Sequence, residues 1–371
     1  MSDIDGISRP RFSSVISSLP PSVPFVAPEA LERAQSTRLK LRLGANESAF
    51  GVSPTALDAM REAVGQTGWY GDPESHDLRL ALSRELRVSI DNVLIGNGID
   101  GLLGYVVRAF VEPVVSVVTS LGTYPTFSYH VTAYGGTIHA VPYRDDRPDL
   151  AGLFEMVVRT KARLVYLANP DNPSGSWLSA IEVGQFVSDL PSDCMLVLDE
   201  AYHEFAPAGS VLPLDAQSSR VIRLRTFSKA HGMAGARIGY AIAASDVIST
   251  FGTFRNQFEV SRVSQAGALA SISDSSFVSG VILAVEEGRR DYEQLAESIG
   301  CPFIPSATNF VCIDVGGADR ARAIVATLLG RGVFIRMPGA PPLNRCIRVT
   351  VGAPLERTEF ADILRDVVSR P

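Results

Sequence analysis

The sequence predicts an α/β protein. We expect a large domain with a mostly parallel sheet wrapped by helices, and a smaller α+β domain formed by both chain ends. From Val93 onward, short β-branched runs alternate with helix-length stretches, which is typical of a parallel sheet. After a long helical region that ends near Gly300, the order becomes strand, helix, strand, strand, helix. We therefore expect an N-terminal arm over 1–45 that joins the small domain, a large domain over 46–275 and a small domain over 276–371.

The expected elements follow from local patterns. PEALERAQ predicts one short helix in the arm; Ser53 and Pro54 mark the next helix as its N-cap and first residue. Asp72-Pro73 predicts a turn before a leucine-patterned helix. The sheet strands are expected in VLIG, VVSVVTS, TIHAVPY, ARLVYLA, CMLVLDEA, VIRLRTF and ARIGYAIA. The long helical region after Ala266 is expected to break near Ser273–Ser276. Ligands of such folds bind at the carboxyl ends of the strands.

Composition narrows the class of protein. Of the 371 residues 46% are hydrophobic and 20% charged, as in a soluble globular chain, and the net charge is −6 with no long run of Lys or Arg, so we expect no nucleic-acid partner. No apolar run reaches the length of a membrane-spanning helix, and the polar N-terminus lacks the apolar core of a secretory signal, so we expect no membrane partner and a cytoplasmic location. The four cysteines are far apart, which favours buried reduced thiols over a metal site.

The segment Thr226–Tyr240, TFSKAHGMAGARIGY, carries the strongest chemical signal. It places Lys229 directly after two hydroxyls, Thr226 and Ser228, and follows it with Arg237. An amine beside hydroxyls and a fixed cation suits an anionic aldehyde. We therefore predict pyridoxal 5'-phosphate as the cofactor, with Lys229 forming the Schiff base and the other three residues holding the phosphate. The competing interpretation is a surface loop with ordinary basic residues.

A glycine turn, Gly96-Asn97-Gly98-Ile99-Asp100-Gly101, follows a strand and opens a helix. It matches the dinucleotide pattern G-x-G-x-x-G, but the next strand ends in Ser120-Leu121-Gly122 without the acidic residue that a ribose requires. What remains is a set of backbone amides at Gly98, Ile99 and Asp100 that suits any phosphate. A plain turn between strand and helix is the alternative.

Three further strand ends supply polar groups. Asp199 ends an apolar strand, where a carboxylate needs a cationic partner such as a protonated pyridine nitrogen; capping the next helix is the alternative. The turn-rich NPDNPSG loop places Asn172, whose amide suits the cofactor's phenolic oxygen, and Tyr202 provides a second hydrogen bond there. Tyr124 follows its strand at a position suited to stacking on the pyridine ring, or is simply a core aromatic.

Together these stretches resemble the fold-type I pyridoxal-phosphate enzymes, which have the aspartate-aminotransferase-like fold, and most closely the histidinol-phosphate aminotransferases. The resemblance runs from about Leu41 to Arg370 through GANESAFG, WYGDP, GNGIDG, NPDNPSG, DEAY, TFSKAHGMAGARIGY, PSATNFV and CIRVTVG. It implies a homodimer in which Tyr70 reaches the neighbouring subunit's cofactor phosphate. It also implies that Arg348 grips a substrate carboxylate, with Arg336 and Asn46 completing the substrate site.

The chain departs from that branch at four places. Pro21-Ser22-Val23-Pro24-Phe25 replaces Pro-Tyr-x-Pro-Gly, and Gln257-Phe258-Glu259 replaces Pro-Tyr-Asn. Gly122 replaces the proline before the tyrosine, and His231 replaces a phenylalanine. These departures bear on the substrate, because Glu259 repels a substrate phosphate if it faces the pocket.

We therefore expect a transaminase that moves an amino group between an amino acid, or histidinol phosphate, and a 2-oxo acid such as 2-oxoglutarate. Lys229, Asp199 and Tyr202 are the expected catalytic residues. A decarboxylase of the threonine-phosphate type stays open, because it needs the same Lys229, Asp199 and Asn172. A dinucleotide-dependent oxidoreductase and a non-catalytic cofactor-binding regulator are the alternatives from other classes; the latter lacks a basic recognition helix.

Overall fold

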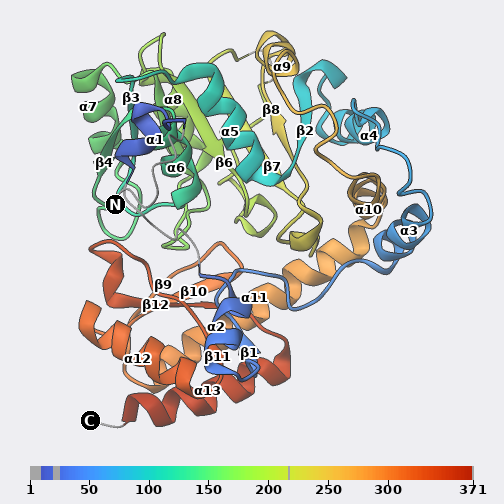
Figure 1. Cartoon of the computed structure of the whole chain (residues 1–371). Helices are drawn as coiled ribbons and strands as arrows, with labels where there is room; N and C mark the ends of the chain where they lie inside the picture. The colour runs from blue at the N-terminus through green and yellow to red at the C-terminus, as the bar shows by residue number, and fades with distance from the viewer. Residues whose placement is uncertain (1–9, 20–25, 216–217, 370–371) are drawn as a thin grey trace.

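The computed structural model describes residues 10–19, 26–215 and 218–369, which form two units joined by a long helix (Figure 1). The larger unit contains a seven-stranded sheet, and the smaller unit contains a three-stranded sheet beside a two-stranded pair. The departure at Pro21–Phe25 lies outside the described residues. The α/β class and the two-unit architecture expected from the sequence are confirmed.

The seven-stranded sheet is mostly parallel and has the order β2-β8-β7-β6-β5-β3-β4. Only β8 runs antiparallel to its neighbours β2 and β7. All seven strands lie in the predicted runs: β2 (Val93–Gly96), β3 (Ser116–Ser120), β4 (Thr137–Val141), β5 (Leu164–Ala168), β6 (Met195–Asp199), β7 (Val221–Thr226) and β8 (Gly239–Ile242). The parallel strands β5, β6 and β7 therefore end side by side.

Helices cover both faces of this sheet because successive strand residues point to opposite sides. In β5, Leu164 and Tyr166 pack with α5 (Gly98–Phe110), α6 (Pro125–Ala133) and α9 (Ser245–Gly252) on one face. Val165 and Leu167 pack with α7 (Leu150–Thr160) and α8 (Ala180–Asp189) on the other. The strands are almost fully buried, so their continuous apolar runs are those of a sheet covered on both faces.

The segment before the sheet is helical. It contains α1 (Ser14–Ser18), which the sequence did not predict, then α2 (Pro28–Gln35), α3 (Pro54–Val64) and α4 (His76–Leu86). Ser53 caps α3 as predicted: its Oγ accepts from the backbone N–H of Ala56. The last two helices lie beside α10 (Arg262–Ser273) at the β2 end of the sheet (Figure 1).

The smaller unit combines both ends of the chain. β10 (Phe310–Asp314) pairs antiparallel with β9 (Phe303–Ile304) and β12 (Cys346–Thr350). The N-terminal β1 (Leu41–Arg42) pairs with β11 (Val333–Phe334). The helices that pack against these strands are α11 (Ser275–Ser298), α12 (Ala318–Gly330) and α13 (Pro354–Ser369).

The four remaining elements of the described residues, in both units, are 3-10 turns: η1 (Ile90–Asn92), η2 (His203–Phe205), η3 (Ala234–Ala236) and η4 (Leu343–Arg345).

The long helical region breaks where expected, since α10 ends at Ser273 and α11 begins at Ser275 with a bend of 81°. Within the residues that the structure describes, no single helix is long and apolar enough to cross a membrane. This bent pair passes such a test by length and composition only. All four cysteines are free and buried.

Candidate active site

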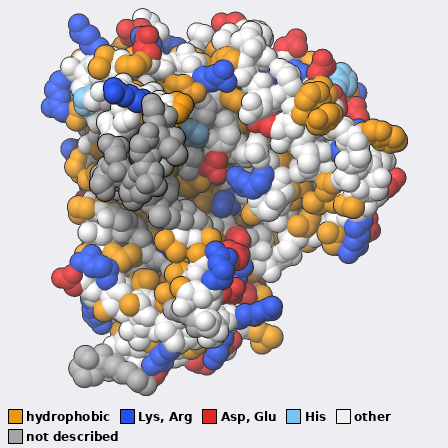
Figure 2. All heavy atoms as spheres, viewed as in Figure 1, with side chains coloured by type: hydrophobic (Ala, Val, Ile, Leu, Met, Phe, Trp, Pro, Cys, Tyr) orange, Lys and Arg blue, Asp and Glu red, His pale blue; other side chains and the backbone are white. Residues whose placement is uncertain are grey.

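Polar side chains gather where the parallel strands end. Asp199 is the last residue of β6, Thr226 is the last residue of β7, and the loop after β5 carries Asn172. The smaller unit faces this edge with β12, which carries Arg348. Figure 2 shows the surface hollowed between the two units, with basic and acidic side chains in the hollow.

Lys229 lies just beyond β7, and its Nζ donates to the backbone oxygen of Asn46 at 2.9 Å. The same Nζ lies 5.6 Å from the centre of the Tyr202 ring. Burial, together with the nearby cations Arg348 and Arg237, lowers the pKa of Lys229 to about 8. A substantial fraction of this amine is therefore neutral near physiological pH, as a nucleophile requires.

The glycine turn and Arg237 form one cradle at the start of α5. An Nη of Arg237 lies 3.1 Å from a carboxylate oxygen of Asp100, whose other oxygen accepts from the Tyr124 hydroxyl at 2.8 Å. Gly98 has a φ of +70°, and a Cβ there would lie 2.6 Å from Nη2 of Arg237. The positive φ therefore favours glycine at the start of α5, and a Cβ there would displace the Arg237 guanidinium.

Two hydroxyls and backbone amides complete this cradle. The Thr226 hydroxyl donates to the Ser228 hydroxyl at 2.9 Å, and both side chains are buried. The N-cap residue of α5, Asn97, makes no capping bond through its side chain, so the first amides of the helix, at Gly98, Ile99 and Asp100, have no side-chain cap there. This donor set fits a phosphate group.

Asp199 is buried and accepts two hydrogen bonds, from the Tyr166 hydroxyl at 2.7 Å and from the backbone N–H of Ala201 at 3.0 Å. Burial nevertheless raises its pKa to about 6. It caps no α-helix, because the following η2 begins at His203 with Tyr202 as its N-cap, so the capping interpretation is wrong. A buried carboxyl with a raised pKa fits a cationic ligand atom.

The neighbouring Glu200 has a different environment, because adjacent residues of a strand point to opposite faces. It accepts from Arg223 and Arg225, and these cations hold the pKa of Glu200 near 2 despite complete burial. This ion pair lies on the far side of the sheet edge from Asp199. Only the first of the two acidic residues therefore belongs to the site.

Tyr202 and Tyr124 both lie at the site edge of the sheet. The Tyr202 hydroxyl accepts from Nδ2 of Asn46 at 2.9 Å, and burial raises its pKa to about 12. Tyr124 is half-buried, precedes α6 and packs against the core on that face. Its pKa is raised, first by burial and then by Asp100. Both phenols therefore keep their protons at neutral pH.

The backbone at position 122 explains why this chain has glycine where the enzymes that its sequence resembles have proline. Its φ is +84°, and a Cβ there would lie 2.5 Å from the Cβ of Ala340. Proline is limited to φ near −65°, so it fits neither the backbone angle nor the space. The loop before β12 closes over this glycine.

Asn172 and Arg348 connect the two units. Nη1 of Arg348 donates to Oδ1 of Asn172 at 2.5 Å, and the guanidinium lies 5.1 Å from the centre of the Phe310 ring. The backbones of Arg336 and Arg348 form an antiparallel bridge, so both cations belong to one wall. Burial and Arg348 lower the pKa of Arg336 to about 10, and its Nη2 donates to the Val26 carbonyl.

Two predicted positions lie outside this cluster. Tyr70 is 75% exposed and stacks on Phe258 with ring centres 4.5 Å apart. Glu259 accepts from the Tyr105 hydroxyl at 2.6 Å and packs near Gly96, and burial raises its pKa. One carboxylate oxygen of Glu259 is thus bonded beside α5, while the other, Oε1, is buried without a hydrogen-bond partner among the described residues.

Sequence patterns missed several residues that support the site. They are Tyr166 under Asp199, Thr350 and Asn309 around Asn46, and Asp171, which accepts from Tyr143 and Ser174 beneath the Asn172 loop. Tyr166 lies two residues before the strand end, so period-two alternation was the available signal for its face. The other partners lie far apart in sequence and gave no local signal.

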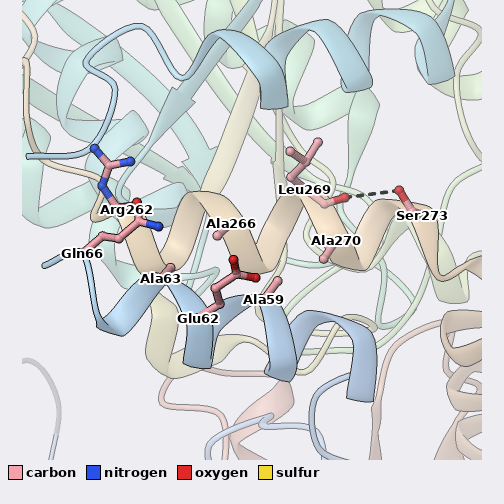
Figure 3. Close-up of a pocket in the computed structure, with 9 residues that line it drawn as sticks. All are labelled: Ala59, Glu62, Ala63, Gln66, Arg262, Ala266, Leu269, Ala270 and Ser273. Carbon is pink, nitrogen blue, oxygen red and sulfur yellow. Dashed lines mark hydrogen bonds between the residues drawn. The ribbon is translucent and has the colours of Figure 1, made fainter.

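A separate depression of about 420 Å³ lies between α3 and α10 (Figure 3). Small side chains of both helices form its floor, and Arg262 closes one end. It contains none of the predicted site residues. It therefore lies apart from the Lys229 cluster.

Comparison with known proteins identifies the class. Residues 38–366 match the family of class I and II aminotransferases, and the chain belongs to this family, close to its histidinol-phosphate aminotransferases. A histidinol-phosphate aminotransferase of Carboxydothermus hydrogenoformans is 32% identical, with 95% of this chain and 98% of that protein covered. One of Bacillus subtilis is 31% identical, covering 96% of this chain and all of that protein.

Solved structures agree. The histidinol-phosphate aminotransferase of Sinorhizobium meliloti, crystallised with pyridoxal 5'-phosphate, is 48% identical with a TM-score of 0.94; the match covers 97% of this chain and 98% of that one. A double mutant of the aspartate aminotransferase of Thermus thermophilus shares the fold, with a TM-score of 0.80 at 21% identity over 97% of this chain and all of that one.

The predicted fold, cofactor and reaction type are thereby confirmed: the protein is a pyridoxal-phosphate-dependent transaminase that acts on small amino and 2-oxo compounds. The decarboxylase alternative is not favoured. The matches also give no support to the dinucleotide-dependent oxidoreductase or to the non-catalytic regulator. The cradle of Arg237, Gly98 and the two hydroxyls, the nucleophilic amine and the buried Asp199 fit this cofactor's phosphate, aldehyde and ring nitrogen.

Proposed function

We propose that Lys229 is the residue that bonds covalently to pyridoxal 5'-phosphate, and that the donor is histidinol phosphate or a related amino acid with a 2-oxo acid as acceptor. One observation supports this most directly. A lysine whose pKa is lowered to about 8 and a buried aspartate whose pKa is raised to about 6 lie at the ends of adjacent strands of one sheet. Such opposite shifts are typical of catalytic pairs.

The remaining residues have positional roles in this proposal. Thr226, Ser228, Arg237 and the amides of Gly98, Ile99 and Asp100 hold the phosphate. The cofactor supplies an electron sink for the bond to be broken. Asp199 keeps the ring nitrogen protonated, because a carboxylate in a buried site strongly favours a cation beside it. Tyr124 stacks on the ring.

Asn172 and Tyr202 donate to the phenolic oxygen. Oδ1 of Asn172 is taken by Arg348, so Nδ2 is the group left to donate. Likewise, the Tyr202 hydroxyl accepts from Asn46, which leaves its own proton available. Lys229, as the nearby amine, moves the proton between Cα and the cofactor, a step that contributes typically 10²–10⁴-fold.

Two guanidiniums set the substrate class. Arg348 and Arg336 share one wall, and Nε of Arg348 is buried without a hydrogen-bond partner in the described part of the chain. An anion that offers two oxygens to the guanidinium satisfies this donor, as a carboxylate or a phosphate does. Asn46 contributes at the same wall, although its side chain already binds Tyr202 and Thr350.

A single-turnover screen tests this proposal. Enzyme in its yellow pyridoxal form is mixed with histidinol phosphate, glutamate or aromatic amino acids, and loss of the yellow absorbance is followed. We expect release of the oxo product and the pyridoxamine form of the cofactor. Carbon dioxide release with the aldehyde form unchanged would establish a decarboxylase instead. Lys229→Ala should bind the cofactor without the lysine-linked absorbance; an Ala variant that keeps this absorbance refutes the assignment.

We also propose a homodimer in which Tyr70 contacts the cofactor phosphate of the second copy. Its support is a continuous exposed surface: Trp69, Tyr70 and Phe258 are each more than half exposed, and Arg262 bonds the Tyr70 carbonyl while closing the groove between α3 and α10. Apolar patches of this kind are typical of protein interfaces.

We propose an arm over 1–45, a cofactor domain over 46–275 and a small domain over 276–371. The bend between α10 and α11 and the pairing of β1 with β11 support these limits. We propose a cytoplasmic location, which the free cysteines support, because reduced thiols are typical of the cytosol.

A further inference from the structure

Asn46 sits in a strained turn that several distant residues hold in place. Its φ is +53°, in the left-handed region that Asn tolerates better than most residues. The Asn46 N–H donates to Oγ1 of Thr350 at 3.0 Å, and the same hydroxyl donates to Oδ1 of Asn46 at 3.2 Å. One buried hydroxyl therefore fixes both the backbone and the side chain of Asn46.

This turn sets the direction in which the backbone carbonyl of Asn46 points. The Asn46 backbone oxygen accepts from Nζ of Lys229 at 2.9 Å and from Nδ2 of Asn309 at 3.1 Å. Thr350 is itself anchored in β12, where its N–H donates to the Leu43 carbonyl and its carbonyl accepts from the Tyr292 hydroxyl. The carbonyl that meets the lysine of the larger unit is thus positioned by the smaller unit.

We infer that Thr350 is a positioning residue for the Lys229 amine, acting through the left-handed turn at Asn46. This inference rests on the proposed role of Lys229. An amine that carries a proton between two atoms must return to one place whenever it is not bonded to the cofactor. The Asn46 carbonyl provides that place, since a hydrogen bond from one N–H fixes the direction of the remaining groups on the nitrogen.

The same turn also positions the Tyr202 hydroxyl. Nδ2 of Asn46 donates to the Tyr202 hydroxyl, so loss of the Thr350 hydroxyl disturbs both the amine and the phenol. Because Thr350 touches neither the Lys229 side chain nor the Tyr202 side chain through its own hydroxyl, its effect is indirect. Loss of the Thr350 hydroxyl must therefore be detected as a change in the pKa or the reactivity of the Lys229 amine.

The charges around Lys229 predict the sign of that effect. Burial, Arg348 and Arg237 lower its pKa, whereas Asp100 and Glu47 raise it. A carbonyl that accepts from the amine stabilises the ammonium form more than the neutral form. Displacing that carbonyl should lower the pKa of Lys229 further.

The sequence makes this pKa measurable, because Lys40, Lys161 and Lys229 are the only lysines in the chain. Enzyme labelled with 13C at lysine Cε and loaded with pyridoxamine 5'-phosphate has a free Lys229 amine. Its signals are assigned with Lys40→Arg and Lys161→Arg, and titrated by NMR. The test variant is Thr350→Val, which keeps the shape and removes the hydroxyl. Thr350→Ser restores the hydroxyl, and Thr327→Val alters an exposed threonine of α12.

We expect the pKa of Lys229 to fall by about one unit in Thr350→Val and to stay unchanged in Thr350→Ser and Thr327→Val. The donor half-reaction of Thr350→Val should slow by about tenfold or more at saturating donor, with little change in cofactor affinity. An unshifted pKa in a folded Thr350→Val variant overturns the inference. If that variant does not fold, Asn46→Ala, which disfavours the left-handed turn, must show the same fall in pKa.

The two proposals fail in different ways. If Lys229→Ala keeps the lysine-linked absorbance, the proposed role of Lys229 is wrong and this inference falls with it. If Lys229→Ala loses the absorbance while Thr350→Val titrates like the parent enzyme, only the positioning role of Thr350 is wrong.

Discussion

Arg348 of the smaller unit donates through Nη1 to Oδ1 of Asn172 of the larger unit at 2.5 Å. This hydrogen bond connects the residue proposed to bind the substrate anion with the residue proposed to bind the cofactor. Because an amide has one oxygen and one nitrogen, occupation of the oxygen orients the nitrogen toward the cofactor side. The substrate site and the cofactor site therefore share one rigid element.

Replacement of Arg348 should weaken donor binding. Arg348→Ala removes a partly buried cation that meets the substrate anion, and we expect kcat/KM for the donor to fall by about 100-fold or more. Arg348→Lys should recover only part of this loss, because an ammonium cannot form two parallel bonds to an anion. Steady-state kinetics measure both effects, and the absorbance of the bound cofactor serves as the control. Equal kcat/KM in Arg348→Lys and parent enzyme would contradict a bidentate role.

Asp199→Asn should stabilise the cofactor-free protein at pH 8. The folded-state pKa is about 6, above the ordinary 3.8, so the folded protein binds the proton more tightly than the unfolded chain does. Stability therefore falls as pH rises from about 4 through 6, and above 6 the full penalty of about 3 kcal/mol is present. Removing the charge removes this penalty.

Urea denaturation at pH 8 and at pH 5 checks this, and the gain should be smaller at pH 5. The loaded enzyme should show the opposite effect, because its ring nitrogen loses its carboxylate partner; kcat should drop by about 100-fold. A variant that is less stable than the parent at pH 8 without cofactor would argue against a net penalty for burying the Asp199 carboxylate.

Gly98→Ala should reduce cofactor affinity. The added Cβ would lie 2.6 Å from Nη2 of Arg237, and the φ of +70° is unfavourable for alanine by about 1–2 kcal/mol. We expect the Kd for pyridoxal 5'-phosphate to rise about tenfold, measured by fluorescence titration. Gly101→Ala is the matched control in the same helix, since its Cβ would meet its nearest neighbour at an ordinary 3.4 Å. Similar losses in both variants would show that helix packing, not the arginine contact, is responsible.

Mixed dimers test the role of Tyr70. Lys229→Ala and Tyr70→Ala homodimers should each have low activity. Unfolding and refolding the two variants together should restore activity, because one hybrid site combines the intact Lys229 of one copy with the intact Tyr70 of the other. Sedimentation should show a dimer throughout. Mixtures no more active than the separate variants would place Tyr70 in its own subunit's site or outside catalysis.

Local sequence was sufficient for most of the fold. The seven apolar runs became β2–β8, and Ser53, Pro54 and the break near Asp274 marked helix ends correctly, because capping and strand burial depend on adjacent residues. The short α1 was missed because its five residues contain no buried side chain and so carry no apolar period. The residues at the strand ends, Asn172, Asp199 and Thr226, were predicted because parallel strands bring their carboxyl ends to one edge.

The sequence by itself thus determined the fold class, the cofactor and the residues at the strand ends. Only the tertiary structure decided their partners. Tyr166 under Asp199, Thr350 beneath Asn46 and Asn309 at the Asn46 carbonyl come from different strands and loops, and Asn46 and Thr350 are 304 residues apart. Such contacts follow from how β12 packs against the segment after β1. No local pattern records that packing, because it is set by the combined burial of both units.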